Sequence, residues 1–251
     1  AGSDALLPAD PADLDGDGLT LVDLESGEVL WTYDVADPES SPLIADGIAY
    51  IGSGFNGRAV VALRTETDRE LEAAGKKRLL WKTEVPHPAT GAVTLTDELV
   101  IVGCGKGDYV FAAPDPEGVV IALDRGTGEI RWQKTLPAAV LGAIAVHGDV
   151  AVAPVRNGEV VALSIEDNGR ILWRSRVHED APILAGPAFT GDIVYAVSKD
   201  GYLAVIDASN GEVLGRHYLN APGKPGEMGL STSSPFVKDG RLYVGSETGG
   251  L

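Results

Sequence analysis

Short runs of alternating hydrophobic and polar residues, each ended by a turn, cover most of the chain. Between Gly18 and Trp31, for example, the runs "GLTLVD" and "EVLW" flank the turn residues "LESG". Runs of about four to eight residues that are rich in β-branched residues and alternate in polarity predict β-strands. The pattern therefore predicts an all-β chain built from short hairpins.

The turn and the strand that follows it recur along the chain. The stretch "DLESGEVLW" (Asp23–Trp31) returns as "DRGTGEIRW" (Asp124–Trp132) and, with glycine in place of tryptophan, as "DASNGEVLG" (Asp207–Gly215). A looser copy from Ser164 to Trp173 has one extra residue, and another from Arg64 to Trp81 has a longer polar insertion. Such internal repeats indicate a repeat architecture.

A second hairpin alternates with the first. The stretch "SPLIADGIAYIGS" (Ser41–Ser53) matches "GPAFTGDIVYAVS" (Gly186–Ser198) and "SPFVKDGRLYVGS" (Ser234–Ser246), and weaker copies start at Gly91 and Leu141. Asp-Gly or Gly-Asp between β-branched residues is a strong hairpin signal. Each repeat is therefore predicted to contain four strands, two around each turn.

Four-stranded units with a period of about 40 to 50 residues are typical of β-propeller blades. If the strands are lettered A to D from the channel outward, four blades are contiguous: 41–85, 89–136, 140–177 and 185–219. Strands C and D of residues 18–35 are expected to pair with strands A and B of residues 233–251. This composite blade would close a five-bladed domain over residues 18–251, with residues 1–17 as an acidic segment. The tail "TGGL" resembles the start of another strand C. The chain could therefore equally be a fragment of a larger propeller, which we keep as an alternative.

The repeated turns indicate how the blades hold together. Each tryptophan follows a turn, where a large ring can fill the gap between adjacent blades. We therefore expect a structural role for the tryptophans and for the Asp and Gly of the two best turns. These residues are Trp31, Trp81, Trp132, Trp173, Asp23, Gly27, Asp124 and Gly128.

The spacing A-x-D-x-x-x-G-x-x-x-W is complete from Ala122 to Trp132 and lacks only the alanine before Asp23. It resembles the tryptophan-docking motif of the pyrroloquinoline quinone (PQQ)-like repeat family, and the resemblance covers nearly everything from Gly18 onward. It implies a β-propeller fold. The family includes quinoprotein alcohol dehydrogenases and a non-enzymatic propeller lipoprotein that helps to assemble outer-membrane barrels.

The departures from the family's enzymes favour its non-enzymatic members. The enzymes usually have an adjacent Cys-Cys pair beside the quinone and a calcium held by Glu, Asn and Asp, but this chain has only Cys104. We therefore expect a non-catalytic binding or scaffolding module outside the cytoplasm, with no cofactor. Two alternatives are a quinoprotein oxidoreductase with PQQ and calcium in the channel, and a propeller that binds or cleaves glycans with facing carboxylates.

Asp13, Asp15 and Asp17 have the D-x-D-x-D-G spacing that opens many calcium loops. An EF-type loop also needs a bidentate acid at its twelfth position, which is Leu24 here. Calcium loops of FG-GAP-type propellers need an acid at the ninth, which is Leu21. We therefore interpret the stretch as an acidic turn before strand C, and keep calcium as a possible ligand.

Propellers commonly bind ligands at the channel mouth, where the B–C and D–A loops lie. The longest of these loops are "GCGKGDYVFAAPDPEG" and "NAPGKPGEMGLSTSS". Long loops on a rigid scaffold often carry function, so we expect a protein partner or a small ligand here. Two histidines, His87 and His178, fall in these loops. The sequence pattern places no acidic residue beside them, so we do not predict a metal site or an acid–base pair there. The candidate residues at the mouth are Arg58, Lys106, Arg156, Lys199, His87 and His178.

The charge of the chain limits its partners. The 20 Lys and Arg residues against 37 Asp and Glu residues give a net charge of −17. Such a charge argues against general binding to nucleic acid or to an anionic membrane. No apolar run approaches the ~20 residues of a membrane-spanning helix.

Overall fold

The computed structural model describes residues 4–8, 18–179, 181–219 and 233–246. Five consecutive antiparallel sheets contain most of the strands. The first sheet contains β1 (Asp4–Pro8), β2 (Gly18–Asp23) and β3 (Val29–Asp34). The second contains β4 (Leu43–Ala45), β5 (Ile48–Gly52), β6 (Ala59–Arg64) and β7 (Leu79–Glu84). The third contains β8 (Thr94–Leu95), β9 (Leu99–Gly105), β10 (Gly118–Asp124) and β11 (Ile130–Leu136).

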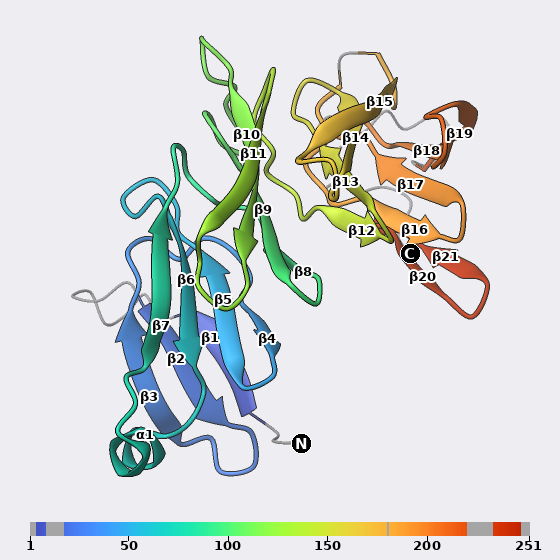
Figure 1. Ribbon diagram of the computed structural model, residues 1–251. Helices are drawn as coiled ribbons and strands as arrows, with labels where there is room; N and C mark the ends of the chain where they lie inside the picture. Colours follow the sequence, from blue (N-terminus) through green and yellow to red (C-terminus); the bar gives the residue numbers. More distant parts are fainter. Residues whose placement is uncertain (1–3, 9–17, 180, 220–232, 247–251) are drawn as a thin grey trace.

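The remaining strands follow the same order. The fourth sheet contains β12 (Ala145–His147), β13 (Val150–Pro154), β14 (Glu159–Ser164) and β15 (Arg170–Arg176). The fifth contains β16 (Ala188–Thr190), β17 (Ile193–Val197), β18 (Tyr202–Asp207) and β19 (Val213–Tyr218). In these sheets the strands pair in sequence order, and the sheets succeed one another in space from blue to orange (Figure 1). The predicted fold class, an all-β propeller of four-stranded antiparallel blades, is confirmed.

A β-bulge lies at the same place in all five C–D pairs. In the third sheet Ala122 pairs with Trp132 but Leu123 pairs with Ile130, so Arg131 is the extra residue. A bulge re-aims the side chains beside it. The same register shift occurs in β2–β3, β6–β7, β14–β15 and β18–β19. In the second, third and fourth sheets the residue opposite the tryptophan is a buried alanine, which leaves room for the ring.

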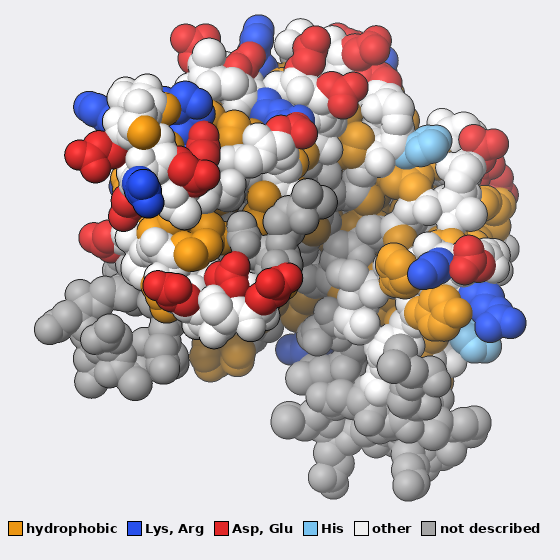
Figure 2. Space-filling view, turned by 90° about the horizontal axis from the view of Figure 1, so that it is seen from below, with side chains coloured by type: hydrophobic (Ala, Val, Ile, Leu, Met, Phe, Trp, Pro, Cys, Tyr) orange, Lys and Arg blue, Asp and Glu red, His pale blue; other side chains and the backbone are white. Residues whose placement is uncertain are grey.

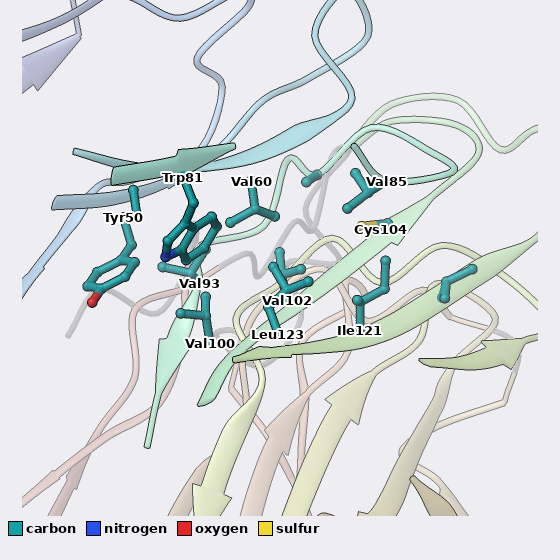
Figure 3. Close-up of a cluster of buried hydrophobic side chains, with 13 residues drawn as sticks. Tyr50, Val60, Trp81, Val85, Val93, Val100, Val102, Cys104, Ile121 and Leu123 are labelled. Atoms are coloured by element: carbon teal, nitrogen blue, oxygen red, sulfur yellow. The ribbon is translucent and has the colours of Figure 1, made fainter. Parts of the chain in front are cut away.

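Both faces of the inner strands are buried against neighbouring sheets. Val100 and Val102 of β9 pack toward Tyr50 and Trp81 of the second sheet, as Figure 3 shows. Ile101, between them in sequence, packs into the core shared with the fourth sheet. Because alternate side chains of one strand enter two different cores, the strands are continuously hydrophobic rather than amphipathic.

The linkers that join consecutive sheets pass very close to the strands. A Cβ atom on Gly103 would lie 2.7 Å from the backbone oxygen of Val140, and one on Gly91 would lie 2.8 Å from that of Leu141. A side chain at either position would collide with the linker, so the close approach requires glycine. Gly103 in β9 and Gly91 in the linker before β8 therefore allow the linker between the third and fourth sheets to pack closely against them.

The structure differs from the predicted closure at the two ends of the described chain. β1 pairs with the free edge of β2 in antiparallel register from Asp4–Asp23 to Pro8–Leu19. β20 (Phe236–Lys238) and β21 (Arg241–Tyr243) instead form a separate hairpin, and β20 contacts β16 (Figure 1). Pairing of β2 with the nearby β1 closes a short loop, whereas pairing with a strand about 200 residues away closes a long one at greater entropic cost.

The polar insertion of the second sheet contains the helix α1 (Asp68–Ala74). The Thr67 hydroxyl accepts a hydrogen bond from the Glu70 backbone N–H, and the Glu70 carboxylate accepts one from the Thr67 backbone N–H. This reciprocal cap satisfies two of the free donors at the start of a helix. Within the described ranges, no helix is long and apolar enough to cross a membrane.

Candidate functional site at the junctions and the channel mouth

Three tryptophan rings pack against a turn glycine of the following sheet. A Cβ atom on Gly128 would lie 2.6 Å from the ring of Trp81. A Cβ atom on Gly169 would lie 2.8 Å from the ring of Trp132, and one on Gly211 would lie 2.8 Å from the ring of Trp173. These glycines have positive φ angles, which suit glycine. The pairs are Trp81 with Gly128, Trp132 with Gly169, and Trp173 with Gly211. The ring of one sheet therefore covers the turn of the next.

In three of the four junctions a hydrogen bond fixes the orientation of the indole ring. The indole N–H groups of Trp31, Trp81 and Trp173 donate to backbone oxygens of the following sheet at 3.2, 3.0 and 2.8 Å. The indole nitrogen of Trp132 is buried and has no acceptor among the described residues. The turn that faces Trp132 is one residue longer than the turn that faces Trp81. The Gly169 N–H donates to the oxygen of Ser164, five residues earlier, whereas the Gly128 N–H donates to the oxygen of Asp124, four residues earlier.

The aspartates of the repeated motif hold the turns in shape. The Asp124 carboxylate accepts hydrogen bonds from the backbone N–H groups of Gly126 and Thr127 at 3.0 and 2.8 Å, and from the Arg131 guanidinium. Arg131 and these turn donors lower the pKa of Asp124 from 3.8 to about 2. Turn donors likewise lower the pKa of Asp23 and Asp207. These carboxylates are thus structural acceptors.

The first junction replaces the turn glycine with an arginine. The guanidinium of Arg78 lies 4.1 Å from the centre of the Trp31 ring. It donates to the backbone oxygens of Arg64 and Glu66 at 2.7 and 2.8 Å, and to the Asp68 carboxylate at 2.5 Å. The planar guanidinium thereby covers the ring and ties the insertion to the sheet.

The two histidines predicted at the mouth lie at different junctions, and each has a carboxylate partner that sequence reasoning did not identify. His87 Nε2 lies 2.6 Å from Glu117 Oε1, and His178 Nδ1 lies 2.6 Å from Asp200 Oδ2. The His178 ring also stacks on Tyr202, with 3.6 Å between centroids. Each pair joins a D–A loop to the B–C loop of the next sheet, and the spacing in the sequence carries no signal of this contact.

The structure brings two of the four predicted cations together. Lys106 forms an ion pair with Asp115 at 2.9 Å, and Arg156 Nε donates to the Asp108 backbone oxygen at 2.8 Å. Both line a cavity of about 140 Å³ under the loop 106–117. Arg58 is exposed and Lys199 is half-buried, and neither is among the described residues that line this cavity.

A larger hollow of about 510 Å³ lies at the opposite end of the second and third sheets, and its lining is rich in paired charges. Arg125 forms an ion pair with Asp46 at 2.5 Å and also donates to the Tyr50 hydroxyl, while Arg131 pairs with Asp124. Figure 2, which views the molecule from below, shows acidic groups beside Lys and Arg and apolar patches. The arginines of this hollow are therefore engaged within the protein.

The described residues do not match the quinone and calcium site that the resemblance to the enzymes implies. Cys104 is the one cysteine of this sequence, so it has no disulfide partner within it. Burial raises its pKa to about 12, which keeps the thiol protonated. Among the residues described, no three His, Cys, Asp or Glu side chains are placed to hold a metal ion. The predicted calcium ligands Asp13, Asp15 and Asp17 lie outside the described residues.

Repeated four-stranded blades joined by docked tryptophans define a β-propeller repeat protein of the PQQ-like class. A family model described as outer membrane protein assembly factor BamB matches residues 15–107 and 101–251. The chain belongs to this family.

Individual relatives agree with this assignment. The chain is 31% identical over 219 residues to the BamB of Legionella pneumophila (strain Paris), which covers 86% of this chain and 50% of the relative. It is 27% identical over 196 residues to the BamB of Francisella salina, with 77% and 34% covered. The chain spans about half the length of the curated relatives that it matches.

Solved structures show the same fold. BamB from Moraxella catarrhalis superimposes with a TM-score of 0.66 at 17% identity, covering 99% of this chain and 78% of that one. A quinohemoprotein alcohol dehydrogenase from Pseudomonas putida HK5 gives 0.68 at 14% identity, covering 88% and 41%. At these identities the similarity concerns the fold alone, which both classes share.

Proposed function

We propose that this chain is part of a non-catalytic, extracytoplasmic propeller that binds protein partners during the assembly of outer-membrane proteins. The match of residues 15–251 to a family described as an outer membrane protein assembly factor carries the proposal. The expected localisation outside the cytoplasm agrees with this family. The mouth supports a binding role, because its histidines and two of its cations hold loops together rather than surround a reactive group.

The test is deletion of the gene in its own organism, followed by measurement of folded outer-membrane β-barrel proteins. Folded and unfolded barrels are separated by their different electrophoretic mobility with and without heating. We expect the folded fraction to fall while transcript levels of the barrel genes stay unchanged, and a plasmid copy of the gene to restore it. An unchanged folded fraction would overturn the proposal.

A separate measurement tests the non-catalytic part of the proposal. The purified chain is incubated with PQQ, calcium, a primary alcohol and an artificial electron acceptor dye. We expect no PQQ-dependent reduction of the dye, because the cysteine pair used by the family's enzymes is absent from the sequence. PQQ-dependent turnover would instead establish the quinoprotein alternative.

A further inference from the structure

The loop 106–117 has a fixed turn at its tip. The Asp108 carboxylate accepts hydrogen bonds from the backbone N–H groups of Val110 and Phe111 at 2.7 and 2.6 Å. The Asp108 backbone N–H donates to the Phe111 oxygen at 3.0 Å, and Gly107 pairs with Ala112 across the turn. The polar groups of the turn are therefore satisfied internally, and its conformation does not depend on a ligand.

Two further contacts hold the loop against the body of the protein. The Tyr109 hydroxyl donates to the Leu141 backbone oxygen at 2.8 Å, on the linker between the third and fourth sheets. Arg156 Nε from the fourth sheet donates to the Asp108 backbone oxygen at 2.8 Å. Because Tyr109 and Arg156 anchor the base of the turn, the tip is positioned by neighbouring sheets rather than free to move.

The side chains at the tip are apolar and face solvent. Val110 is 67% exposed and Phe111 is 72% exposed, and Phe55, in the B–C loop of the second sheet, is 42% exposed. Aromatic side chains, phenylalanine included, are enriched at the cores of protein interfaces, where a few buried residues carry most of the binding energy. A tip that is already ordered loses little entropy on binding.

Unpaired negative charge lies beside the tip. A Cβ atom on Gly54 would lie 3.0 Å from carboxylate oxygens of both Asp37 and Glu39, so the two acids converge on the loop that carries Phe55. Partial burial and the charges of Asp37 and Asp108 raise the pKa of Glu39. Glu39 forms no ion pair within the described residues. Burial and the charge of Glu39 raise the pKa of Tyr109, which lies at the base of the tip. A positive charge from outside would relieve this repulsion.

We propose that the tip and the adjacent carboxylates form a docking surface for a protein segment that presents a Lys or Arg beside an apolar side chain. This proposal rests on the proposed binding function. The apolar side chain of the partner contacts Val110 and Phe111, and its basic group approaches Glu39 and Asp37. The cavity of about 140 Å³ behind the loop, similar in size to the ~150 Å³ that holds one benzene, offers a second apolar contact. The net charge of −17 favours the approach of a basic partner.

The first experiment selects peptides from a random dodecapeptide phage library on the immobilised chain and measures the Kd of synthetic copies. We expect selected peptides to carry Lys or Arg next to an aromatic or aliphatic residue. Phe111→Ser should weaken binding at least about tenfold, and Glu39→Gln should weaken it and reduce its salt dependence. Failure to select such peptides, or binding that survives Phe111→Ser, would overturn the proposal.

Matched controls lie at the opposite end of the sheets. Leu24→Ser removes an apolar side chain that is 58% exposed, and Asp97→Asn removes an exposed carboxylate. Both should leave peptide binding unchanged. Because Phe111 is exposed, Phe111→Ser should leave the melting temperature unchanged, which separates loss of contact from loss of fold.

Two other occupants would be revealed by the same variants. If a second copy of this chain occupies the tip, the sedimentation coefficient rises with concentration and Phe111→Ser abolishes the rise. If a membrane surface occupies it, the wild type but not Phe111→Ser pellets with phosphatidylglycerol vesicles. Either result without selected basic peptides overturns the proposal of a protein segment.

The outcomes also separate this proposal from the proposed function. If gene deletion leaves folded barrel proteins unchanged while basic peptides bind at Phe111, the assembly function fails and the docking surface stands. If deletion lowers folded barrels but chromosomal Phe111→Ser does not, and peptides bind elsewhere, the docking surface alone fails.

Discussion

A turn glycine and a tryptophan ring form the smallest repeated contact of this protein. The contact depends on the absence of a side chain, since a Cβ on Gly128 would overlap the Trp81 ring. The glycine also adopts a φ of 76°, so both its backbone angle and its surroundings exclude other residues. Single substitutions at these turns should therefore reveal how much each junction contributes.

We expect Gly128→Ala to lower the free energy of unfolding by about 2–4 kcal/mol. About 1–3 kcal/mol comes from the collision with Trp81, and about 1 kcal/mol from a left-handed backbone with a side chain. Urea denaturation of the wild type and the variant measures the difference.

Gly27→Ala is the matched control for this substitution. Gly27 occupies the same position of its repeat with a φ of 72°, but no atom lies within 4 Å of its Cβ position. It should lose only about 1 kcal/mol, the backbone contribution. Equal losses at Gly27 and Gly128 would show that the ring contact contributes nothing.

The titration of Asp124 predicts part of the acid sensitivity. Its folded pKa of about 2 lies below the ordinary value of 3.8, so folding favours the ionised form. The stability from Asp124 is complete above pH about 4 and is lost as the pH falls toward 2. Asp124→Asn removes this titration, so its free energy of unfolding should fall less steeply over that window.

The measurement is urea denaturation at a series of pH values between about 2 and 6. Asp97→Asn serves as the control, because Asp97 is exposed and its side chain makes no hydrogen bond within the described part of the chain. Parallel pH profiles for the wild type and Asp124→Asn would contradict the structural role assigned to the Asp124 carboxylate.

At the level of elements, most strands were predictable because hairpin signals are local. A hairpin is recognised from about ten consecutive residues, namely an Asp-Gly or Ser-Gly turn and the alternating strands beside it. The four sheets from β4 to β19 accordingly fall inside the predicted repeats. The helix α1 was missed although its capping pair, Thr67 and Glu70, is visible in "TDRE". β1 was missed because five residues in an acidic segment carry too little pattern.

Arg78 connects the insertion of the second sheet to the first junction. Arg78→Lys keeps the charge but loses the planar group that covers Trp31 and donates to two backbone oxygens. We expect a loss of about 1–2 kcal/mol in the free energy of unfolding, close to that of Arg78→Ala. Arg69→Lys, an exposed change in the same insertion, should have no effect in the same denaturation assay.

At the scale of the whole molecule, sequence reasoning reached the class of fold but not its closure. β2 pairs with β1 rather than with β21. This choice depends on the entropic cost of closing the loop between the paired strands and on which strand edges are free, and a local sequence pattern contains neither quantity. The candidate site shows the same limit. His87 and Glu117 are 30 positions apart, so only the packing of adjacent blades brings them together.

Ligand-dependent melting tests the cofactor predictions on the intact chain. We expect no rise in melting temperature with calcium or with calcium plus PQQ, relative to EDTA. A ligand present at a hundred times its Kd would stabilise the folded state by about 2.7 kcal/mol, which a melt detects easily. A rise with calcium alone that Asp13→Asn and Asp15→Asn abolish would make the N-terminal aspartates a metal site.

The docked tryptophans have a consequence for how such proteins diversify. In three of the four junctions the receiving half contains a turn glycine, and in three it contains a backbone oxygen that accepts the indole N–H. Neither group depends on a particular side chain. A blade with a tryptophan on its last strand can therefore dock onto any blade that has this kind of turn between its last two strands. Unequal recombination that duplicates or deletes one whole blade leaves complementary half-junctions on both sides, so propellers of different size can arise from one gene in a single step.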